Sequence, residues 1–459
     1  MILFIWPTLA QASITQKLDD LLQTLPPGSV HGIEVLGAES GKLIYARNST
    51  LNLLPASTLK TVTSITAYDV LGPDFRFTTQ IASQRKPLSG STYTGDLVLS
   101  FSGDPSLTHD DLANLIKALT AQGVRKIKGN LWLDNTVYAG YPRAGGTIWD
   151  DRNICFAAPA SAIILDRNCF FGWLKPAAKS GKPARMTYDQ PDWLLKVDNQ
   201  VITRQPSETE TLGCVQEVWP SRDYEYQLSG CIVPEREPMR MAFSVRNVER
   251  SARRFIRSVL TKKGIVLKGQ IKTGKPKGAF NYVLVSHQSE ALPVLLDRVL
   301  EESDNIYTDS LLKTLGAKHT GLPGSYYTGT QAIREIMNEQ GVALERSRLV
   351  DGSGLSRYNH LSAEDMAEVL AVGWRLWGED APWLKTRDKE EQWLKTGYMS
   401  GVSNMVGYVF PEKAQEPLIF AVLLNGLRPK QPATKEQVRA FHQDIRQFHR
   451  SFLSLLQEK

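Results

Sequence analysis

The sequence contains a serine and a lysine whose spacing would place both on one face of a helix. Ser57-Thr58-Leu59-Lys60 separates the hydroxyl from the amine by three positions, close to one helical turn. A lysine whose pKa is lowered by burial and neighbouring cations can accept the proton of such a serine, so that the hydroxyl becomes a nucleophile without a histidine. The spacing alone is a weak signal. Residues 83–86 and 310–313 repeat it, and any single match of this kind is usually a solvated helix face.

Two further triplets supply the other groups that such a serine needs. Ser303-Asp304-Asn305 offers a second hydroxyl able to relay a proton and an amide able to hold a peptide carbonyl. Lys395-Thr396-Gly397 offers a cation and a hydroxyl for a carboxylate, and a glycine that lets a substrate lie against a strand edge. The order S-x-x-K, S-x-N, K-T-G is far more specific than any one triplet. Lys272-Thr273-Gly274 precedes the S-x-N element and leads into Lys275-Pro276, so we set it aside.

The elements at the two ends of the chain have to position these triplets. Two β-rich runs over residues 31–48 predict a hairpin, and a helix is expected over 57–71, directly after Leu53-Leu54-Pro55-Ala56. Near the C-terminus we expect strands over about 402–410 and 417–424, then an amphipathic helix over about 434–456. A hairpin and a helix at both ends indicate one split domain that is closed by its termini.

The middle of the chain has a different sequence pattern. From about 75 to 285, short alternating strands such as 96–101 and 130–134 are separated by turn signals. This pattern predicts a β-rich insertion of one or two small domains.

Composition excludes several other classes of protein. With 459 residues, of which 42% are hydrophobic and 22% charged, the chain is typical of a globular protein of two or three domains. Its net charge of +6 is too small for its length to predict nucleic-acid binding. There is no G-x-S-x-G or H-E-x-x-H motif. The G-x-x-x-x-G-K run at 269–275 is followed by Pro276 where a P-loop needs Ser or Thr, so we expect a surface turn there.

The N-terminal segment differs from the rest. MILFIWPTLAQA (1–12) is uncharged, with a short apolar core and a small-x-small end, and it predicts a secretory signal peptide that has lost its basic start. An apolar N-terminus without that role is the alternative. Elsewhere no run of 18 apolar residues predicts a transmembrane segment.

Four cysteines lie in the middle of the chain, and none has the spacing of a zinc site. An even number in an exported protein indicates two disulfides, for which three pairings exist. We favour the local one, Cys155–Cys169 and Cys214–Cys231, whose loops would each stabilise the fold by ~3 kcal/mol. Four reduced, buried thiols are the alternative.

Taken together, the motifs resemble those of the serine penicillin-recognising enzymes. Within that group the chain resembles the class C low-molecular-mass penicillin-binding proteins, the D-alanyl-D-alanine carboxypeptidase/endopeptidases. The resemblance runs from residue 31 to the end and includes the long insertion. It rests on these stretches: LLPASTLKTVTSITAYDVLGPDFRF (53–77), FSGDPSLT (101–108), FAAPASAIILDRNCF (156–170), ESDNIYTDSLLKTLG (302–316), DGSGLSRYN (351–359) and KTGYMSGVSNMVGYV (395–409).

The resemblance implies a role for each site residue. Ser57 would be the acylated nucleophile and Lys60 its base. Ser303 and Asn305 would act as proton relay and carbonyl holder. Lys395 and Thr396 would form the carboxylate clamp, and Gly397 would let the substrate lie against the strand edge. The backbone N–H groups of Ser57 and Tyr398 would form the oxyanion hole, with Tyr at 398 where the family usually has Ser. Asp151 is the best match to an aspartate that reaches the family's site from the insertion, and a plain surface acid is the alternative.

The resemblance also implies an α+β fold, a β-lactamase/transpeptidase-like catalytic domain with inserted β-rich domains. We expect the catalytic domain over 13–75 and 285–459, an inserted domain over 76–165 and 245–284, and a second one over 166–244. The implied function is a periplasmic serine DD-peptidase that acts on peptidoglycan stem peptides, is acylated by β-lactams and uses no metal or other cofactor. Its oligomeric state stays open, a dimer included. The alternatives are a serine β-lactamase and an inactive peptidoglycan-binding scaffold.

Overall fold

The structure is a computed structural model that describes residues 13–85, 91–212, 214–234, 236–386, 391–430 and 434–458. The predicted signal segment, 1–12, lies outside the described residues. The chain divides into two compact units, which are described here one at a time. Unit 1 comprises Met1–Ile65, Arg334–Leu349 and Tyr358–Lys459, and unit 2 comprises Thr66–Ile333 and Val350–Arg357.

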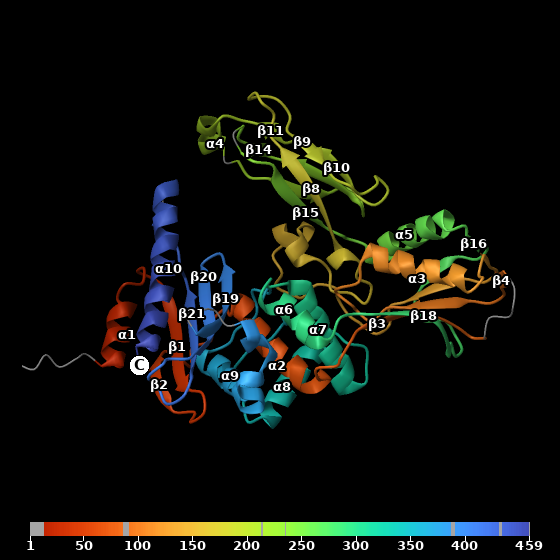
Figure 1. The fold of residues 1–459 in the computed structure, drawn as a ribbon. Coiled ribbons are helices and arrows are strands. Elements are labelled where there is room, and N and C mark those ends of the chain that lie inside the picture. Colours follow the sequence, from red (N-terminus) through yellow and green to blue (C-terminus); the bar gives the residue numbers. More distant parts are fainter. Residues whose placement is uncertain are drawn as a thin grey trace, which may run out of the picture. The chain divides into compact units, whose positions relative to one another are not determined.

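Unit 1 is built on one antiparallel sheet of five strands (Figure 1). In spatial order the strands are β19 (Gln392–Met399), β20 (Val402–Val409), β21 (Leu418–Asn425), β1 (Val30–Gly37) and β2 (Leu43–Arg47). The predicted N-terminal hairpin and both predicted C-terminal strands are confirmed. Strands from the two ends of the sequence pair along β1 and β21, from Val30↔Asn425 to Gly37↔Leu418, so both ends of the chain contribute to one sheet.

Helices cover both faces of this sheet. On one face α1 (Ile14–Leu22) and α10 (Lys435–Gln457) pack over a cluster of buried residues that includes Leu18, Phe420 and Phe452. On the other face α9 (Ala363–Trp377) packs against β1 and β21. The sequence sets the start of α10, because the Thr434 side chain accepts a hydrogen bond from the backbone of Gln437 in a capping box.

Unit 2 contains a mixed five-stranded sheet with helices α3 (His109–Ala121) and α5 (Val248–Lys262) packed over a shared apolar core. Its strands, in spatial order, are β17 (Ile271–Thr273), β7 (Leu131–Asp134), β5 (Leu97–Ser100), β3 (Thr78–Ser83) and β18 (Tyr282–Gln288). The strands predicted at 96–101 and 130–134 are confirmed. The surface turn expected at 269–275 is wrong in part, because Ile271–Thr273 pairs in parallel with β7 as an edge strand.

Smaller sheets complete the insertion, which is β-rich as predicted. They are β16 (Val266–Leu267), β6 (Lys126–Ile127) and β4 (Thr92–Tyr93); β15 (Met239–Ser244), β8 (Cys169–Lys175) and β9 (Arg185–Thr187); β10 (Lys196–Asn199), β13 (Glu225–Ser229) and β12 (Glu217–Pro220); and β11 (Ile202–Thr203) with β14 (Cys231–Ile232). The remaining helices are α2 (Leu59–Leu71), α3 (His109–Ala121), α4 (Pro206–Leu212), α5 (Val248–Lys262), α6 (Leu292–Leu300), α7 (Asn305–Thr320) and α8 (Tyr326–Glu339). The division of the insertion into two domains stays a prediction.

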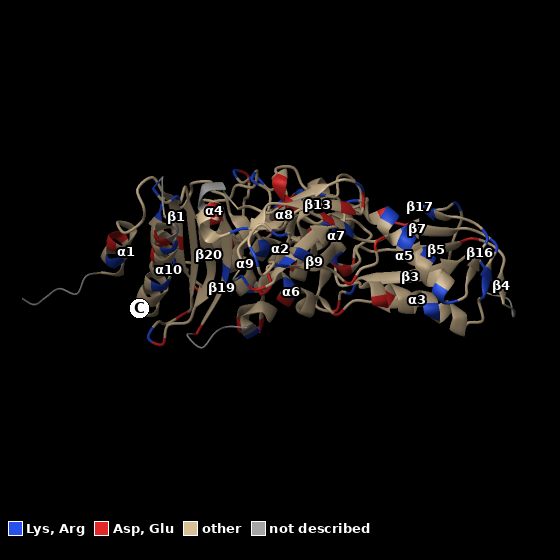
Figure 2. Cartoon of the chain, turned by 90° about the horizontal axis from the view of Figure 1, so that it is seen from above, with Lys and Arg blue, Asp and Glu red and all other residues tan. Residues whose placement is uncertain are grey.

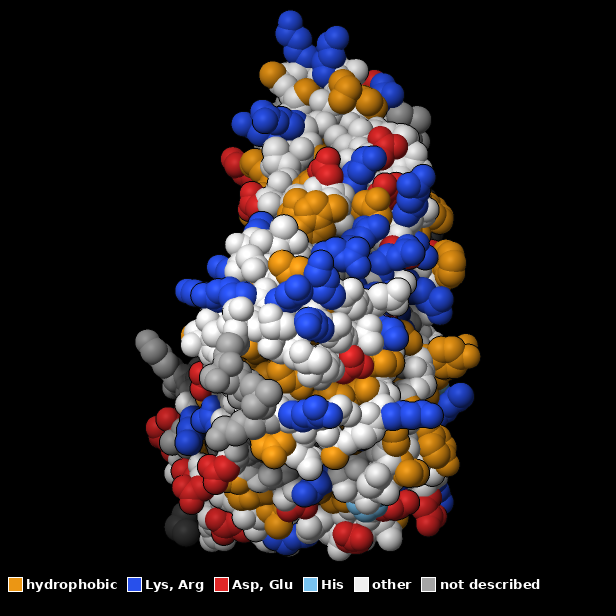
Figure 3. Space-filling model, turned by 90° about the vertical axis from the view of Figure 1, so that its right-hand side faces the viewer, with side chains coloured by type: hydrophobic (Ala, Val, Ile, Leu, Met, Phe, Trp, Pro, Cys, Tyr) orange, Lys and Arg blue, Asp and Glu red, His pale blue; other side chains and the backbone are white. Residues whose placement is uncertain are grey.

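Both local disulfides are present, Cys155–Cys169 and Cys214–Cys231, so the favoured pairing is confirmed and the alternative of reduced thiols is wrong. Charged residues are distributed along the whole chain (Figure 2). On the face shown in Figure 3, Lys and Arg side chains alternate with apolar and acidic ones. Among the helices described, none has both the length and the apolar character needed to cross a bilayer.

Candidate active site

The candidate nucleophile lies where the chain enters a helix. Ala56–Thr58 forms a short 3-10 turn, η1, that continues directly into α2. Lys60 is fully buried and its Nζ donates a hydrogen bond to Ser57 Oγ over 3.0 Å, which confirms that the two side chains share one face. Ala56 has a φ of 48°, in the left-handed region that residues with a Cβ seldom adopt. Such backbone strain is found most often at functional turns, and here it precedes the serine directly.

Strand β19 passes this turn at backbone distance. A Cβ on Gly397 would lie 2.8 Å from the carbonyl oxygen of Pro55 and 3.0 Å from the amide nitrogen of Ser57. No side chain fits there, so the close approach requires glycine. This close approach brings the backbone around Gly397 beside the N–H of Ser57. Backbone N–H groups from the strand and the turn could there donate hydrogen bonds to the same carbonyl oxygen.

The K-T-G triplet lies in the middle of strand β19. Lys395 is buried and its Nζ donates a hydrogen bond to the carbonyl of Thr396 over 3.2 Å. Side chains alternate along the strand. Trp393 packs against Tyr408 and Trp383, whereas Leu394 packs into the core under α10. Lys395 and Gly397 therefore face away from α10, and Thr396 and Tyr398 face toward it.

Two asparagines that the sequence did not point to hold the turn before Ser57 in place. Asn404, fully buried on β20, donates from Nδ2 to the carbonyls of Leu54 and Pro55, both at 2.8 Å. Asn425, at the end of β21, accepts a hydrogen bond from the Leu54 N–H over 2.9 Å. These hydrogen bonds fix the backbone just before Ser57 to β20 and β21, two strands near the C-terminus. Asn404 falls in the 395–409 stretch, but nothing in its sequence context marked it as a positioning residue.

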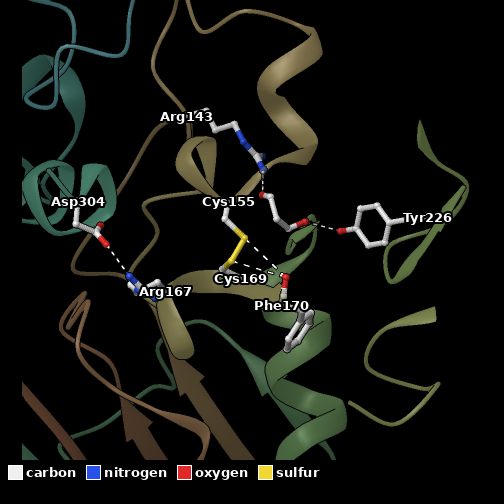
Figure 4. The surroundings of a disulfide bond; sticks show 8 residues. Arg143, Cys155, Arg167, Cys169, Phe170, Tyr226 and Asp304 are labelled. Atoms are coloured by element: carbon white, nitrogen blue, oxygen red, sulfur yellow. Dashed lines mark hydrogen bonds and ion pairs between the residues drawn. A yellow bond between two sulfur atoms is a disulfide. The ribbon is translucent and has the colours of Figure 1, made fainter. Parts of the chain in front are cut away.

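The S-x-N triplet belongs to unit 2 and begins α7. Ser303 also has a left-handed backbone, with a φ of 54°. Asp304 caps the helix by accepting from the N–H groups of Ile306 and Tyr307, and it forms an ion pair with Arg167 at 3.1 Å (Figure 4). The Ser303–Asn305 turn is thus fixed by a helix cap and an ion pair. A cavity of about 260 Å³ lies beside it, lined also by Arg167 and the Cys155–Cys169 disulfide.

Asn305 is tied to the loop that carries Asp151. Its Nδ2 donates to the carbonyl of Phe156 over 2.8 Å, and Asp151 lies shortly before Phe156 in the chain, within η2 (Asp150–Asn153). Burial and the neighbouring Asp150 raise the pKa of the Asp151 carboxyl, while Arg357 opposes the shift. Asp151 is therefore not a fully solvated surface acid, although its role stays a prediction.

The other serine–lysine matches differ from Ser57–Lys60. Ser83 lies in β3 rather than in a helix, and residue 86 lies outside the described residues. A solvated helix face is wrong for residues 310–313, because both end residues are buried. Lys313 donates to the carbonyls of Tyr141 and Ala160, and burial lowers its pKa to about 8. Lys313 contacts these carbonyls and the rings of Tyr138 and Tyr326, as suits a structural cation.

The second K-T-G triplet lies on β17, a short edge strand. Lys272 is half-buried and lies over the ring of Trp132, with Nζ 5.1 Å from the ring centre. Within the parts of the chain that are described, no group of three or more His, Cys, Asp or Glu side chains could hold a metal ion.

Comparison with known proteins places the chain in a family. The model of the D-Ala-D-Ala carboxypeptidase 3 (S13) family matches residues 14–375. The D-alanyl-D-alanine carboxypeptidase DacB of Haemophilus influenzae is 32% identical over 367 residues, covering 80% of this chain and 75% of that protein. A D-alanyl-D-alanine carboxypeptidase of Actinomadura sp. strain R39 is 27% identical over 456 residues, covering 92% of this chain and 83% of that one. The chain belongs to the D-Ala-D-Ala carboxypeptidase 3 (S13) family.

Solved structures agree with this assignment. The crystal structure of penicillin-binding protein 4 from H. influenzae matches with a TM-score of 0.82 and 30% identity, covering 94% of this chain and 98% of that one. The same protein in complex with a β-lactam matches with a TM-score of 0.78 and 28% identity over the same shares. The resemblance to penicillin-binding proteins and the predicted α+β, β-lactamase/transpeptidase-like fold with insertions are confirmed.

Proposed function

We propose that the chain is a serine DD-peptidase that cleaves D-Ala-D-Ala ends, and also D-Ala cross-bridges, of peptidoglycan through an acyl-enzyme. The observation that carries this function is the buried Lys60 with its Nζ 3.0 Å from Ser57 Oγ, in a turn that Gly397 of β19 approaches at backbone distance. This pairing of a hydroxyl with a buried amine is what nucleophilic catalysis without histidine requires.

The proposed reaction has two balanced steps. The Ser57 Oγ attacks the carbonyl carbon of the penultimate D-alanine while its proton passes to the amine of Lys60. The negative oxygen of the tetrahedral intermediate is held by the N–H groups of Ser57 and Tyr398. The bond to the terminal D-alanine then breaks, and the leaving nitrogen takes up a proton. Water hydrolyses the resulting ester, which releases the shortened peptide and restores Ser57.

The remaining roles follow the motifs of the family. Ser303 relays the proton to the leaving nitrogen, and Asn305 holds the carbonyl on the acyl side of the substrate. Lys395 and Thr396 hold the terminal carboxylate, and Asp151 contributes to binding of the stem peptide. The buried position of Lys395 supports a charge-assisted contact with that carboxylate, since such contacts are stronger in a desolvated setting.

The relatives support the substrate and the inhibitor. Two of them are D-alanyl-D-alanine carboxypeptidases by name, and the H. influenzae structure has been solved with a β-lactam. We therefore propose that peptidoglycan stem peptides are substrates and that β-lactams acylate Ser57. The two disulfides support export to the periplasm, where such bonds persist.

One experiment separates this function from its alternatives. The purified protein is labelled with a fluorescent penicillin and, separately, incubated with a pentapeptide ending in D-Ala-D-Ala. A DD-peptidase labels, loses the label slowly and releases free D-alanine. A β-lactamase would release the hydrolysed penicillin rapidly, and a scaffold would neither label nor release D-alanine.

A further inference from the structure

A cavity of about 480 Å³ lies at the far end of β19, entirely within unit 1. The β19–β20 hairpin forms one wall, and the middle of α10 forms another. In the five-stranded sheet Tyr398 pairs with Ser403 across this hairpin. Both residues line the cavity on the face of the sheet that α10 covers, and Tyr398 is also the proposed oxyanion donor. The cavity therefore begins where the proposed catalytic strand segment ends.

The lining fits an anion attached to an apolar chain. It includes Arg446 and His442 from α10 and apolar walls such as Phe441 and Ile445, and none of the described residues that line it is acidic. Within the described residues Arg446 has no ion pair or hydrogen bond. Ser403 is only 6% exposed, and its hydroxyl has no hydrogen-bond partner among those residues. A guanidinium and a buried hydroxyl without a protein partner are groups that a carboxylate could satisfy.

The direction in which a substrate would run along β19 follows from the proposed function, on which this inference rests. Lys395 and Thr396 hold the terminal carboxylate, and the N–H of Tyr398 receives the oxygen of the carbonyl under attack. From residue 395 to residue 398 one therefore moves from the substrate's C-terminus toward its N-terminus, so the substrate is antiparallel to β19. Because β19 is an edge strand of the sheet, a peptide can be added along it.

The part of the substrate that precedes the acylated alanine continues past Met399 toward the β19–β20 turn. At about 3.3 Å per residue, one or two residues are enough to reach the cavity from the oxyanion site. We propose that this cavity binds the acidic part of the stem peptide, N-terminal to the bond that is cleaved, with its carboxylate paired to Arg446. The site would select peptides by an acidic residue that the reaction itself does not touch.

The test compares two synthetic pentapeptides that end in D-Ala-D-Ala and differ at one residue. One has a γ-linked glutamate at its second position, and the other has the corresponding amide. The ratio of kcat/KM for the acid over the amide is measured for wild type and for Arg446→Gln. Loss of one charge-assisted contact predicts that Arg446→Gln lowers this ratio roughly tenfold.

Arg450→Gln is the matched control. Arg450 lies one turn further along α10, is exposed, donates to Gln447 and does not line the cavity, so its variant should keep the wild-type ratio. An unchanged ratio in Arg446→Gln, or an equal fall in Arg450→Gln, would overturn the inference while the wild type still releases D-alanine. If the wild type releases none from either peptide, the proposed function fails, and this inference with it.

Discussion

Gly397 shows at the level of one residue how the chain builds the proposed reaction centre. Neither the carbonyl of Pro55 nor the amide of Ser57 can move away independently, because both belong to the turn that Asn404 fastens to β20. Only a glycine at this position therefore allows the strand to lie so close to the turn. From the sequence alone, this glycine is expected only to let the substrate approach the strand.

Gly397→Ala should damage acylation and stability together. The added methyl meets backbone atoms at 2.8–3.0 Å, which overpacks the site and costs about 1–3 kcal/mol. A displacement of the strand by about 1 Å should lower the rate of penicillin acylation roughly a hundredfold. Gly145→Ala is the control, since a Cβ there meets nothing within 4 Å. Thermal unfolding and the second-order acylation rate are measured for both, and equal behaviour of the two variants would contradict this account.

Alanine variants of the two K-T-G lysines test which of them binds the substrate carboxylate, Lys395 on β19 or Lys272 on β17. Lys395→Ala removes a buried cation, and a charged hydrogen bond is worth ~1.5–3 kcal/mol, so acylation should fall roughly tenfold to several-hundredfold. Lys272→Ala removes a contact with Trp132 and should cost about 0.5–1 kcal/mol of stability with little effect on acylation. A larger loss of acylation from Lys272→Ala would reverse the assignment.

At the scale of single residues, the sequence predicts candidate groups for the chemistry but not the groups that position them. Ser57 and Lys60 were identified by spacing, and the 3.0 Å contact agrees with it. Asn404 and Asn425 act through backbone carbonyls and amides of a distant turn, a role that residue type and spacing do not reveal. The left-handed backbone of Ala56 and Ser303 was likewise hidden, since neither is a glycine.

Among the elements, β1 carries an unusual feature in the buried side chain of Glu34. Burial, reinforced by Glu364, Glu368 and Asp365, raises the pKa of this carboxyl to about 7. Its ordinary value is 4.5, so between pH 4.5 and 7 the folded chain binds a proton that the unfolded chain does not. The stability that this proton contributes is complete below pH 4.5 and is lost as the pH rises toward 7.

Glu34→Gln should therefore stabilise the protein at pH 8, by about 1–3 kcal/mol, and the gain should shrink toward pH 5. Thermal melts across this range measure the difference from wild type. Glu39→Gln, in the exposed turn after the same strand, should show no such trend. A gain that is the same at pH 5 and pH 8 would show that Glu34 is not protonated in the folded state.

Elements with strong local signals were predicted well from the sequence. The hairpin β1–β2, strands β20 and β21 and helix α10 all lie within about two residues of their predicted bounds. For strand β17 the sequence predicts a turn, because Gly and Pro residues flank it. Its three residues form a strand only by pairing with β7, some 140 positions earlier in the chain. Pairing over such a distance is set by tertiary packing, which local propensity cannot show.

On the scale of the whole molecule, the disulfides stabilise the insertion. They close loops of 14 and 17 positions, and each should contribute ~3 kcal/mol by restricting the unfolded chain. The double variants Cys155→Ser/Cys169→Ser and Cys214→Ser/Cys231→Ser should each lower the Tm by several degrees. Protein purified without reductant should contain no reactive thiol when unfolded. Four titratable thiols in that sample would contradict both pairings.

The central claim is that Ser57 forms the acyl-enzyme, and one measurement tests it most directly. The protein is reacted with penicillin and digested, and mass spectrometry locates the modified residue. We predict one penicilloyl group per chain, attached to Ser57, and no adduct in Ser57→Ala whose circular dichroism matches wild type. An adduct on another serine such as Ser303 or Ser310, or undiminished labelling of Ser57→Ala, would contradict the account.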